Sequence, residues 1–139
     1  MIIVDTNVIS ELTRALPNAN VITWMRAQRL TQLAVTTVTL AELQLGIELM
    51  PLGQRRTILS QHLATLLTKS FGDRILSFDE LAVPRYARLG ALRKSAGRAS
   101  EVAVLMIAAI AASRGFSVCT RNIADFEFCG VPLLNPWQA

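Results

Sequence analysis

The sequence predicts one α/β domain, residues 1–139, in which a central parallel β-sheet is flanked by helices. Strand-like and helix-like segments alternate along the whole chain, and repeated strand–helix–strand units form parallel sheets covered by helices. With 139 residues, 52% hydrophobic and 17% charged, the chain has the size and composition of one globular domain with a substantial core. It contains no repeats, linkers or low-complexity stretches that would divide it further.

Five short runs of apolar or β-branched residues predict the strands of this sheet. In chain order they are Met1–Val4, Leu33–Val38, Arg74–Phe78, Phe116–Thr120 and Gly130–Leu134. The last run contains Pro132, which cannot donate a hydrogen bond to a neighbouring strand, so we expect that strand to be short.

Six segments carry apolar residues at helical spacing and predict the helices. They are Val8–Arg14, Asn20–Gln28, Leu40–Leu49, Arg55–Phe71, Asp79–Gly97 and Val102–Ala112. We expect Ser100 to cap the start of the last helix and Gly115 to end it. This helix is the longest apolar run of the chain, but it is too short and too rich in alanine to span a bilayer.

Two features indicate a protein of the reducing cytoplasm. Cys119 and Cys129 are the only cysteines, and their spacing fits neither a metal site nor a redox motif, so we interpret them as free thiols. The first strand begins at Met1, so we expect no signal peptide.

The formal net charge of +4 and the pI of about 9.8 permit a polyanionic partner without demanding one. Basic residues gather in one stretch between residues 85 and 98, namely Arg85, Arg88, Arg93, Lys94 and Arg98. This stretch has two interpretations, a phosphate-binding surface or the solvated face of a helix.

Polar side chains follow two of the predicted strands at the points where the strands end. Asp5 comes directly after the first strand, and Thr120, Arg121 and Asn122 follow the fourth. In open α/β sheets the functional site lies beyond the carboxyl ends of the strands, so these residues are candidates for the functional site. Asp5 also has a structural interpretation, because an aspartate can cap the following helix.

Glu42 has two interpretations as well. Thr39 and Glu42 have the spacing of a capping box, in which the glutamate reaches back to the start of its own helix. Alternatively, Glu42 faces the strand ends near Asp5.

The other acids and the single histidine are less distinctive. We interpret Glu11 and Glu48 as surface acids, Asp79 and Glu80 as helix-start acids, and His62 as a structural side chain within a helix. Asp125 either caps a turn or faces the pocket of Asp5. The chain has no glycine-rich phosphate loop, no Ser/His/Asp set and no Cys/His pair, so the remaining chemistry is carboxylates that hold a hard divalent cation.

Five stretches of the chain resemble the PIN-domain nucleases, and within them the VapC/FitB-like toxins of bacterial toxin–antitoxin pairs. They are "IVDTNVISEL", "VTLAELQLGI", "ILSFDE", "GRASEVAVLMIAAIAASRGFSVCTRNIADF" and the terminal "NPW". The resemblance implies a single PIN domain with a parallel sheet between helices, acids gathered at the strand ends, Mg²⁺ or Mn²⁺ as cofactor, and metal-assisted hydrolysis of RNA.

The resemblance also assigns roles to particular residues. Asp5 matches the first acid of the family pattern and Glu42 the second. Asn122 stands at the fourth position, where it offers a carbonyl oxygen but no charge. Thr6 and Asn7 match the polar neighbours of the first acid. Thr120 completes the supporting residues, and Arg121 joins the basic stretch as a candidate RNA contact.

The third acid of the family pattern is missing. It stands three residues before an "IAA" run, and counting back from Ile107 gives Val104, which cannot bind a metal. Glu101 lies one helical turn earlier on about the same face and is one alternative ligand, with Asp125 the other. With a valine at this position, the protein is a weak nuclease, a nuclease that uses one of these acids, or an inactive binding protein. A further alternative is that the valine is an engineered substitution.

Two functions follow from the resemblance. The first is a Mg²⁺-dependent endoribonuclease toxin whose metal site is impaired or rearranged by Val104. The second is a catalytically inactive PIN protein that binds an antitoxin and occupies operator DNA jointly with it. Under either function the resemblance implies a cognate antitoxin as partner, DNA contact only through the antitoxin complex, no membrane, and a homodimer.

Overall fold

The computed structural model describes residues 1–139 and contains a five-stranded sheet in the order β3-β2-β1-β4-β5, with every pair of neighbours parallel. The strands are β1 Ile2–Val4, β2 Leu33–Thr36, β3 Ile75–Leu76, β4 Ser117–Cys119 and β5 Leu133–Leu134. The prediction of a parallel sheet between helices is confirmed.

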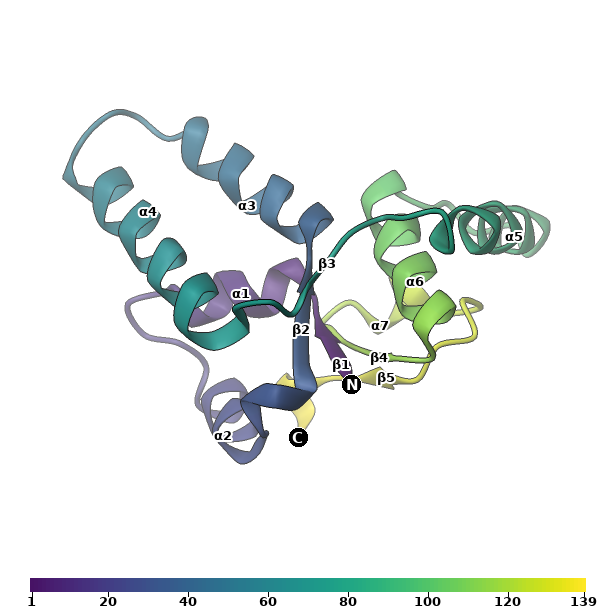
Figure 1. Cartoon of the computed structure of the whole chain (residues 1–139), viewed down its shortest axis with the longest axis horizontal. Coiled ribbons are helices and arrows are strands. Elements are labelled where there is room, and N and C mark those ends of the chain that lie inside the picture. The colour runs from purple at the N-terminus through teal and green to yellow at the C-terminus, as the bar shows by residue number, and fades with distance from the viewer.

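The helices cover both faces of this sheet. They are α1 Thr6–Leu12, α2 Ala19–Ala27, α3 Thr37–Glu48, α4 Gln54–Leu66, α5 Ala82–Ser95, α6 Val102–Arg114 and α7 Ile123–Phe126. Figure 1 shows α1 to α4 on one side of the strands and α5 to α7 on the other. None of these helices combines the length and the apolar character that crossing a membrane requires.

Alternation of side chains along the strands divides the core into two parts. Ile3 and Val118 are fully buried among residues of α5 and α6. Their chain neighbours Val4 and Cys119 are fully buried on the opposite face, among residues of α1 to α4. Because both faces are covered, the strands are apolar except for Thr36 and Ser117 at strand ends, as is usual in parallel sheets.

The helix boundaries differ from the prediction where polar side chains cap the backbone. α1 begins at Thr6 rather than Val8, because the carboxylate of Asp5 accepts a hydrogen bond from the backbone N–H of Thr6. α3 begins at Thr37, because the hydroxyl of Thr36 accepts from the backbone N–H of Thr39. The second strand therefore ends at Thr36, and residues 37 and 38 are helical.

Two further helical segments differ from the prediction. The segment predicted as one helix over Arg55–Phe71 is α4 followed by a single π-helical turn, Leu67–Phe71. α5 begins at Ala82, where the carboxylate of Asp79 accepts from the Ala82 N–H at 3.2 Å, as expected for a helix-start acid. Short 3-10 helices at Leu30–Gln32 and Pro136–Gln138, and the single turn of α7, were not predicted.

The end of α6 agrees with the prediction, whereas its start does not. Gly115 ends the helix in the left-handed conformation, with φ of 69°, which glycine adopts without steric cost. Ser100 does not cap the start, because Glu101 is the N-cap residue and no side chain bonds the first turn. The Ser100 hydroxyl instead accepts a hydrogen bond from Arg93, which explains the failed expectation.

The order of the strands reverses beside β1. The chain passes from β1 to β2 and β3 on one side, and β4 and β5 then fill the other side. The switch point between β1 and β4 is where open α/β sheets bind ligands. Asp5 and Thr120 lie there, each directly after its strand.

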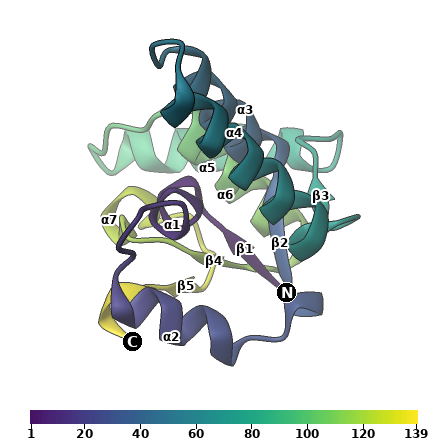
Figure 2. The same ribbon diagram turned by 90° about the vertical axis from the view of Figure 1, so that its left-hand side faces the viewer.

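The last residues of the chain return to the N-terminal half. Figure 2 shows the C-terminus beside α2. The side-chain amide of Asn20, in α2, donates a hydrogen bond to the backbone carbonyl of Trp137 at 2.8 Å. The terminal "NPW" segment is therefore attached to α2.

Candidate functional site

A cavity of about 520 Å³ opens at the carboxyl ends of β1 and β4. Fourteen residues line it, and only three of them are hydrophobic. Its acids are Asp5, Glu11, Glu42, Glu101 and Asp125. Its other lining residues include Thr6, Asn7, Arg14, Val104, Arg121, Asn122 and Trp137. The structure thus brings most of the sequence-predicted site residues into one space.

Asp5 caps α1, as one interpretation of the sequence expected, and it also lines the cavity. Its Oδ1 accepts from the backbone N–H of Thr6 at 2.8 Å, so it caps α1. Its other oxygen, Oδ2, accepts from the hydroxyl of Thr120 at 2.8 Å and from the amide of Asn7 at 3.1 Å. Only 7% of Asp5 is exposed, so these donors take the place of water around a nearly buried carboxylate.

Burial raises the pKa of Asp5 above its ordinary value. The hydrogen bonds from Thr120, Thr6 and Asn7 lower this pKa, and the nearby negative charge of Glu42 raises it. Burial outweighs the hydrogen bonds, so the ionised carboxylate is not fully compensated by its protein neighbours. A positive charge in the cavity would complete the compensation.

Glu42 is attached to Asp5 through a single residue. The Glu42 carboxylate accepts a hydrogen bond from the hydroxyl of Thr6 at 2.7 Å, while the backbone N–H of Thr6 binds Asp5. The expectation that Glu42 faces the strand ends near Asp5 is therefore correct in its geometry. The two carboxylates differ in environment, because Asp5 is buried and Glu42 is exposed.

The capping-box interpretation of Thr39 and Glu42 is wrong. Thr36, not Thr39, is the N-cap of α3, and its hydroxyl accepts from the Thr39 backbone N–H at 3.1 Å. Thr39 is fully buried, and its hydroxyl contacts those of Thr36 and Thr6. This chain of hydroxyls orients Thr6 and leaves Glu42 directed to the cavity.

The residues after β4 connect the two switch-point strands. Besides its bond to Asp5, the Thr120 hydroxyl accepts from the backbone N–H of Asn122 at 3.0 Å. The backbone N–H of Arg121 donates to the side-chain oxygen of Asn7 at 3.2 Å. These bonds keep Asn122 and Arg121 at the cavity with their side chains exposed.

The Cys119 thiol, one residue before Thr120, is not part of the site chemistry. It is fully buried at the end of β4. Burial, with the negative charge of Asp5 as the smaller cause, raises the pKa of Cys119 to about 12. At neutral pH the thiol stays protonated, and only a thiolate is a good nucleophile or metal ligand. Cys119 and Cys129 are both free, as expected, and both are buried.

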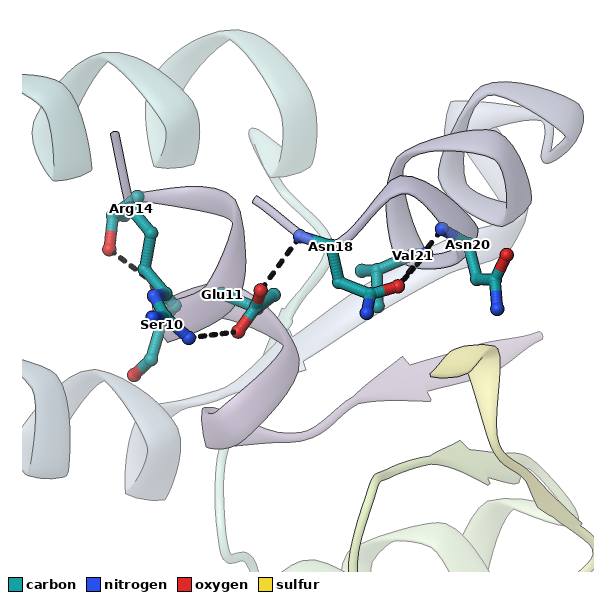
Figure 3. A network of polar contacts seen from close by, with 7 residues as sticks. Ser10, Glu11, Arg14, Asn18, Asn20 and Val21 are labelled. Atoms are coloured by element: carbon teal, nitrogen blue, oxygen red, sulfur yellow. Dashed lines mark hydrogen bonds and ion pairs between the residues drawn. The ribbon is translucent and has the colours of Figure 1, made fainter. Parts of the chain in front are cut away.

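Glu11 is a site residue that the sequence interpretation missed. Figure 3 shows its carboxylate between Arg14 and the backbone of Asn18. One oxygen accepts from the Asn18 N–H at 2.8 Å and the other pairs with Arg14 at 3.2 Å. Only 6% of Glu11 is exposed, so it is not a surface acid. The spacing of Asn7 and Glu11, four residues apart on one helix, could have indicated a shared face.

Val104 and the two alternative acids lie along the same cavity. Val104 is half-buried, whereas Glu101 and Asp125 are exposed. No three acidic, histidine or cysteine side chains come close enough together to hold a metal ion. A role for Glu101 or Asp125 as a third ligand stays a prediction. His62 is exposed on α4 and does not line the cavity.

The basic stretch does not form one continuous positive surface. Arg93 is only 3% exposed, and its guanidinium donates to the Ser100 hydroxyl and to the backbone carbonyls of Ala99 and Glu127. These bonds tie the end of α5 to the loops before α6 and after α7. The assignment of Arg93 as an RNA contact is therefore wrong, because its donors are used inside the protein.

The other basic residues of the stretch lie outside the acidic cavity. Arg98 pairs with Glu127 at 3.3 Å, which offsets its charge. Arg85 and Arg88 line a separate cavity of about 490 Å³ between α5, α6 and the loop that joins α7 to β5. Lys94 is exposed on α5. A phosphate-binding role for Arg85, Arg88 and Lys94 stays a prediction.

Comparison with known proteins connects this geometry to a family. A model of the PIN domain matches residues 2–127. The chain is 48% identical over 139 residues to the plasmid stability protein StbB of Pseudomonas syringae pv. tomato, covering 100% of both sequences. It is 41% identical over 138 residues to the VapC ribonuclease Y4jK of Sinorhizobium fredii, covering 99% of each.

Two solved structures resemble this fold closely. The crystal structure of FitAcB from Neisseria gonorrhoeae superposes with a TM-score of 0.93 at 35% identity, covering 100% of both chains. The structure of FitAB bound to an IR36 DNA fragment superposes with a TM-score of 0.92 at 34% identity, covering 99% of this chain and 96% of that one. In both comparisons the similarity extends over almost the whole chain.

Proposed function

This chain belongs to the PIN domain family, and from that premise we propose that it is a divalent-metal-dependent endoribonuclease, the toxin of a toxin–antitoxin pair. One observation carries the proposal: Asp5 and Glu42, from different elements, meet through Thr6 in a polar cavity at the switch point of the sheet. The similarity over 99% of the chain to a protein named as a VapC ribonuclease supports the choice of RNA as substrate.

The residues of the cavity fit a hard divalent cation with a reduced set of ligands. Mg²⁺ binds oxygen donors and keeps several waters besides one or two carboxylates. Asp5 and Glu42 would supply those two carboxylates, and Val104 stands at the position where the family pattern has a third. A bound Mg²⁺ or Mn²⁺ would polarise the scissile phosphate and lower the pKa of a bound water.

Hydrogen bonds from neighbouring residues orient these two carboxylates. Thr6 and Thr120 donate hydrogen bonds that fix the orientation of Glu42 and Asp5 respectively. Asn7 donates a further bond to Asp5, and the exposed Asn122 amide is positioned to bind a phosphate oxygen or a water. Such outer-shell partners typically change metal affinity or activity by about ten- to a hundredfold when removed.

We further propose the partners that this function requires. One similar structure is that of FitAB bound to a DNA fragment, and we infer that this chain likewise pairs with an antitoxin and contacts DNA only within that complex. A homodimer of the chain and a location in the cytoplasm belong to the same proposal.

Cleavage of purified RNA tests the proposal. Protein freed of its antitoxin is incubated with transfer RNA, ribosomal RNA and messenger RNA, each with Mg²⁺, with Mn²⁺ or with chelator. We expect cutting of at least one RNA class that needs the metal, and no cutting of single-stranded DNA of matched sequence. A protein that binds its antitoxin but cuts no RNA under any of these conditions would contradict the nuclease proposal.

A further inference from the structure

The backbone of Trp137 is held by hydrogen bonds beside the acidic cavity, which its ring lines. Trp137 belongs to the terminal 3-10 helix, where its backbone N–H donates to the side chain of Asn135 at 3.0 Å. Its backbone carbonyl accepts from Asn20 at 2.8 Å. The ring is half-buried against the core on the α1 to α4 side of the sheet and also lines the cavity. The bonded backbone and the half-buried ring lower the entropy cost of using the indole as a binding surface.

Arg121 stacks on this ring. Its guanidinium carbon lies 5.2 Å from the centre of the Trp137 ring, within the range of a cation–π contact. The backbone of Arg121 is held from the other side, because its N–H donates to Asn7, which also binds Asp5. The stacked pair, called here the Arg121–Trp137 platform, is therefore joined on one side to α2 and on the other to the carboxylate site.

The charges that line the cavity indicate what this pair could bind. Five acids line the cavity against two basic residues, Arg14 and Arg121. Arg14 is paired with Glu11, whereas Arg121 forms no ion pair. A phosphodiester that approaches these acids is repelled, so binding needs an attractive surface beside them. Arg121 is the lining cation that is free to provide it.

We propose that the Arg121–Trp137 platform binds a nucleobase of single-stranded RNA beside the phosphate that is cut. The proposal rests on the ribonuclease function proposed above and adds a base-binding site to it. Single-stranded RNA is recognised by stacking its splayed bases on aromatic rings or on guanidinium planes. The exposed face of the guanidinium offers such a plane, and its charge attracts the neighbouring phosphate. Because larger rings stack over more area, we expect a preference for purines.

Fluorescence of Trp137 tests binding without cleavage. The chain has two tryptophans, so Trp24→Phe leaves Trp137 as the only indole emitter. This variant is titrated, in chelator, with a purine-containing RNA hexamer and with a hexamer of equal charge that has one abasic position. We expect saturable quenching by the first and binding that is about five- to a hundredfold weaker for the second, the range that loss of one stacked base produces. Equal quenching by both would overturn the base-binding site.

Cleavage kinetics provide an independent test. Trp137→Leu and Arg121→Ala should each raise KM about five- to a hundredfold with a smaller change in kcat, because stacking acts before the chemical step. Trp137→Phe should recover part of the loss, whereas Arg121→Lys should recover little, since it keeps the charge but not the plane. Arg29→Ala is the matched control, because Arg29 is exposed and lies before the start of β2, whereas the cavity lies beyond the carboxyl ends of the strands.

The outcomes separate the two proposals. A protein that cuts RNA with unchanged KM in the Trp137 and Arg121 variants is a nuclease without this platform. Quenching that depends on the base in a protein that never cuts RNA would support the platform and contradict the nuclease. Should Trp137→Leu fail to fold, the exposed Arg121→Ala variant and the quenching of the Trp24→Phe variant still decide the matter.

Discussion

The hydroxyl of Thr6 donates a hydrogen bond to the carboxylate of Glu42 at 2.7 Å, although 36 residues separate them in sequence. The backbone N–H of the same threonine binds Asp5 at 2.8 Å. One residue therefore sets the positions of both carboxylates at the switch point of the sheet. The arrangement depends on the hydroxyl and not on the shape of the side chain alone.

Replacing Thr6 by valine keeps the shape and removes the hydroxyl. We expect Thr6→Val to weaken Mn²⁺ binding by about ten- to a hundredfold, because an orienting partner of a metal ligand is lost. The measurement is the Mn²⁺ concentration needed for half of the thermal stabilisation. Thr6→Ser retains the donor and should behave like the unmodified protein. Equal Mn²⁺ affinity in all three proteins would show that Thr6 does not orient Glu42.

The pH dependence of stability should reveal the raised pKa of Asp5. The carboxyl has an ordinary pKa of 3.8 in the unfolded chain and a higher pKa in the folded one, so the folded state binds the proton more tightly. This contribution to stability is complete below pH 3.8 and is lost as the pH rises through the folded pKa.

Asp5→Asn removes this titration, so the metal-free variant should gain stability relative to the unmodified protein as the pH rises from about 4 to about 7. Melting temperatures of both proteins in chelator across that range provide the measurement. Any constant offset reports the altered hydrogen bonds to Thr120 and Thr6. A difference that does not vary with pH would contradict the raised pKa.

Val104→Asp should restore a third carboxylate to the cavity. Without metal we expect the free energy of unfolding to fall by about 1–3 kcal/mol, because like charges then repel across the cavity. Millimolar Mg²⁺ or Mn²⁺ should reverse the loss, since a ligand that binds only the folded state stabilises it by mass action. RNA cleavage should rise in the same variant.

Val102→Asp is the matched control for that substitution. It places the same charge on the same helix, but Val102 is 62% exposed and does not line the cavity. Its stability should show no added response to metal. Identical metal responses in the two variants would mean that position 104 does not face the bound ion.

Arg93 should act in folding rather than in RNA binding. Arg93→Met leaves the backbone carbonyls of Ala99 and Glu127 without their donor, and we expect a loss of about 2–4 kcal/mol in urea unfolding. Lys94→Met changes an exposed neighbour and should stay within about 0.5 kcal/mol. Equal, small effects of the two substitutions would contradict the buried role of Arg93.

Much of the fold could be predicted because its signals are local. The apolar strands and the amphipathic helices follow from periodicity, and the end of α6 follows from Gly115. The starts of α1 and α3 were placed too late, because Asp5 and Thr36 extend these helices through side-chain caps. The predicted cap at Ser100 does not form, because the Ser100 hydroxyl accepts a hydrogen bond from Arg93, seven residues earlier in the chain.

Of the candidate site, the residues that could be predicted from the sequence are those that directly follow a strand. Asp5 and Thr120 follow strands directly, so the sheet topology alone brings them together. Glu11 was missed because its burial depends on the loop that returns to Asn18, and no local pattern records that contact. The pairing of Arg121 with Trp137 was missed likewise, because the path of the C-terminal segment, which no local pattern records, brings them together.

The proposed catalysis depends most directly on Asp5 as a carboxylate that holds a divalent cation. The decisive measurement is the single-turnover rate of RNA cleavage in Mn²⁺ by the unmodified protein, by Asp5→Asn and by Glu42→Gln. Both substitutions keep size and remove one charge. We predict that each lowers the rate by more than about a hundredfold, since loss of a ligand exceeds the loss of an outer-shell partner. Cleavage by Asp5→Asn at the unmodified rate, or cleavage that persists in chelator, would contradict metal-dependent catalysis at Asp5.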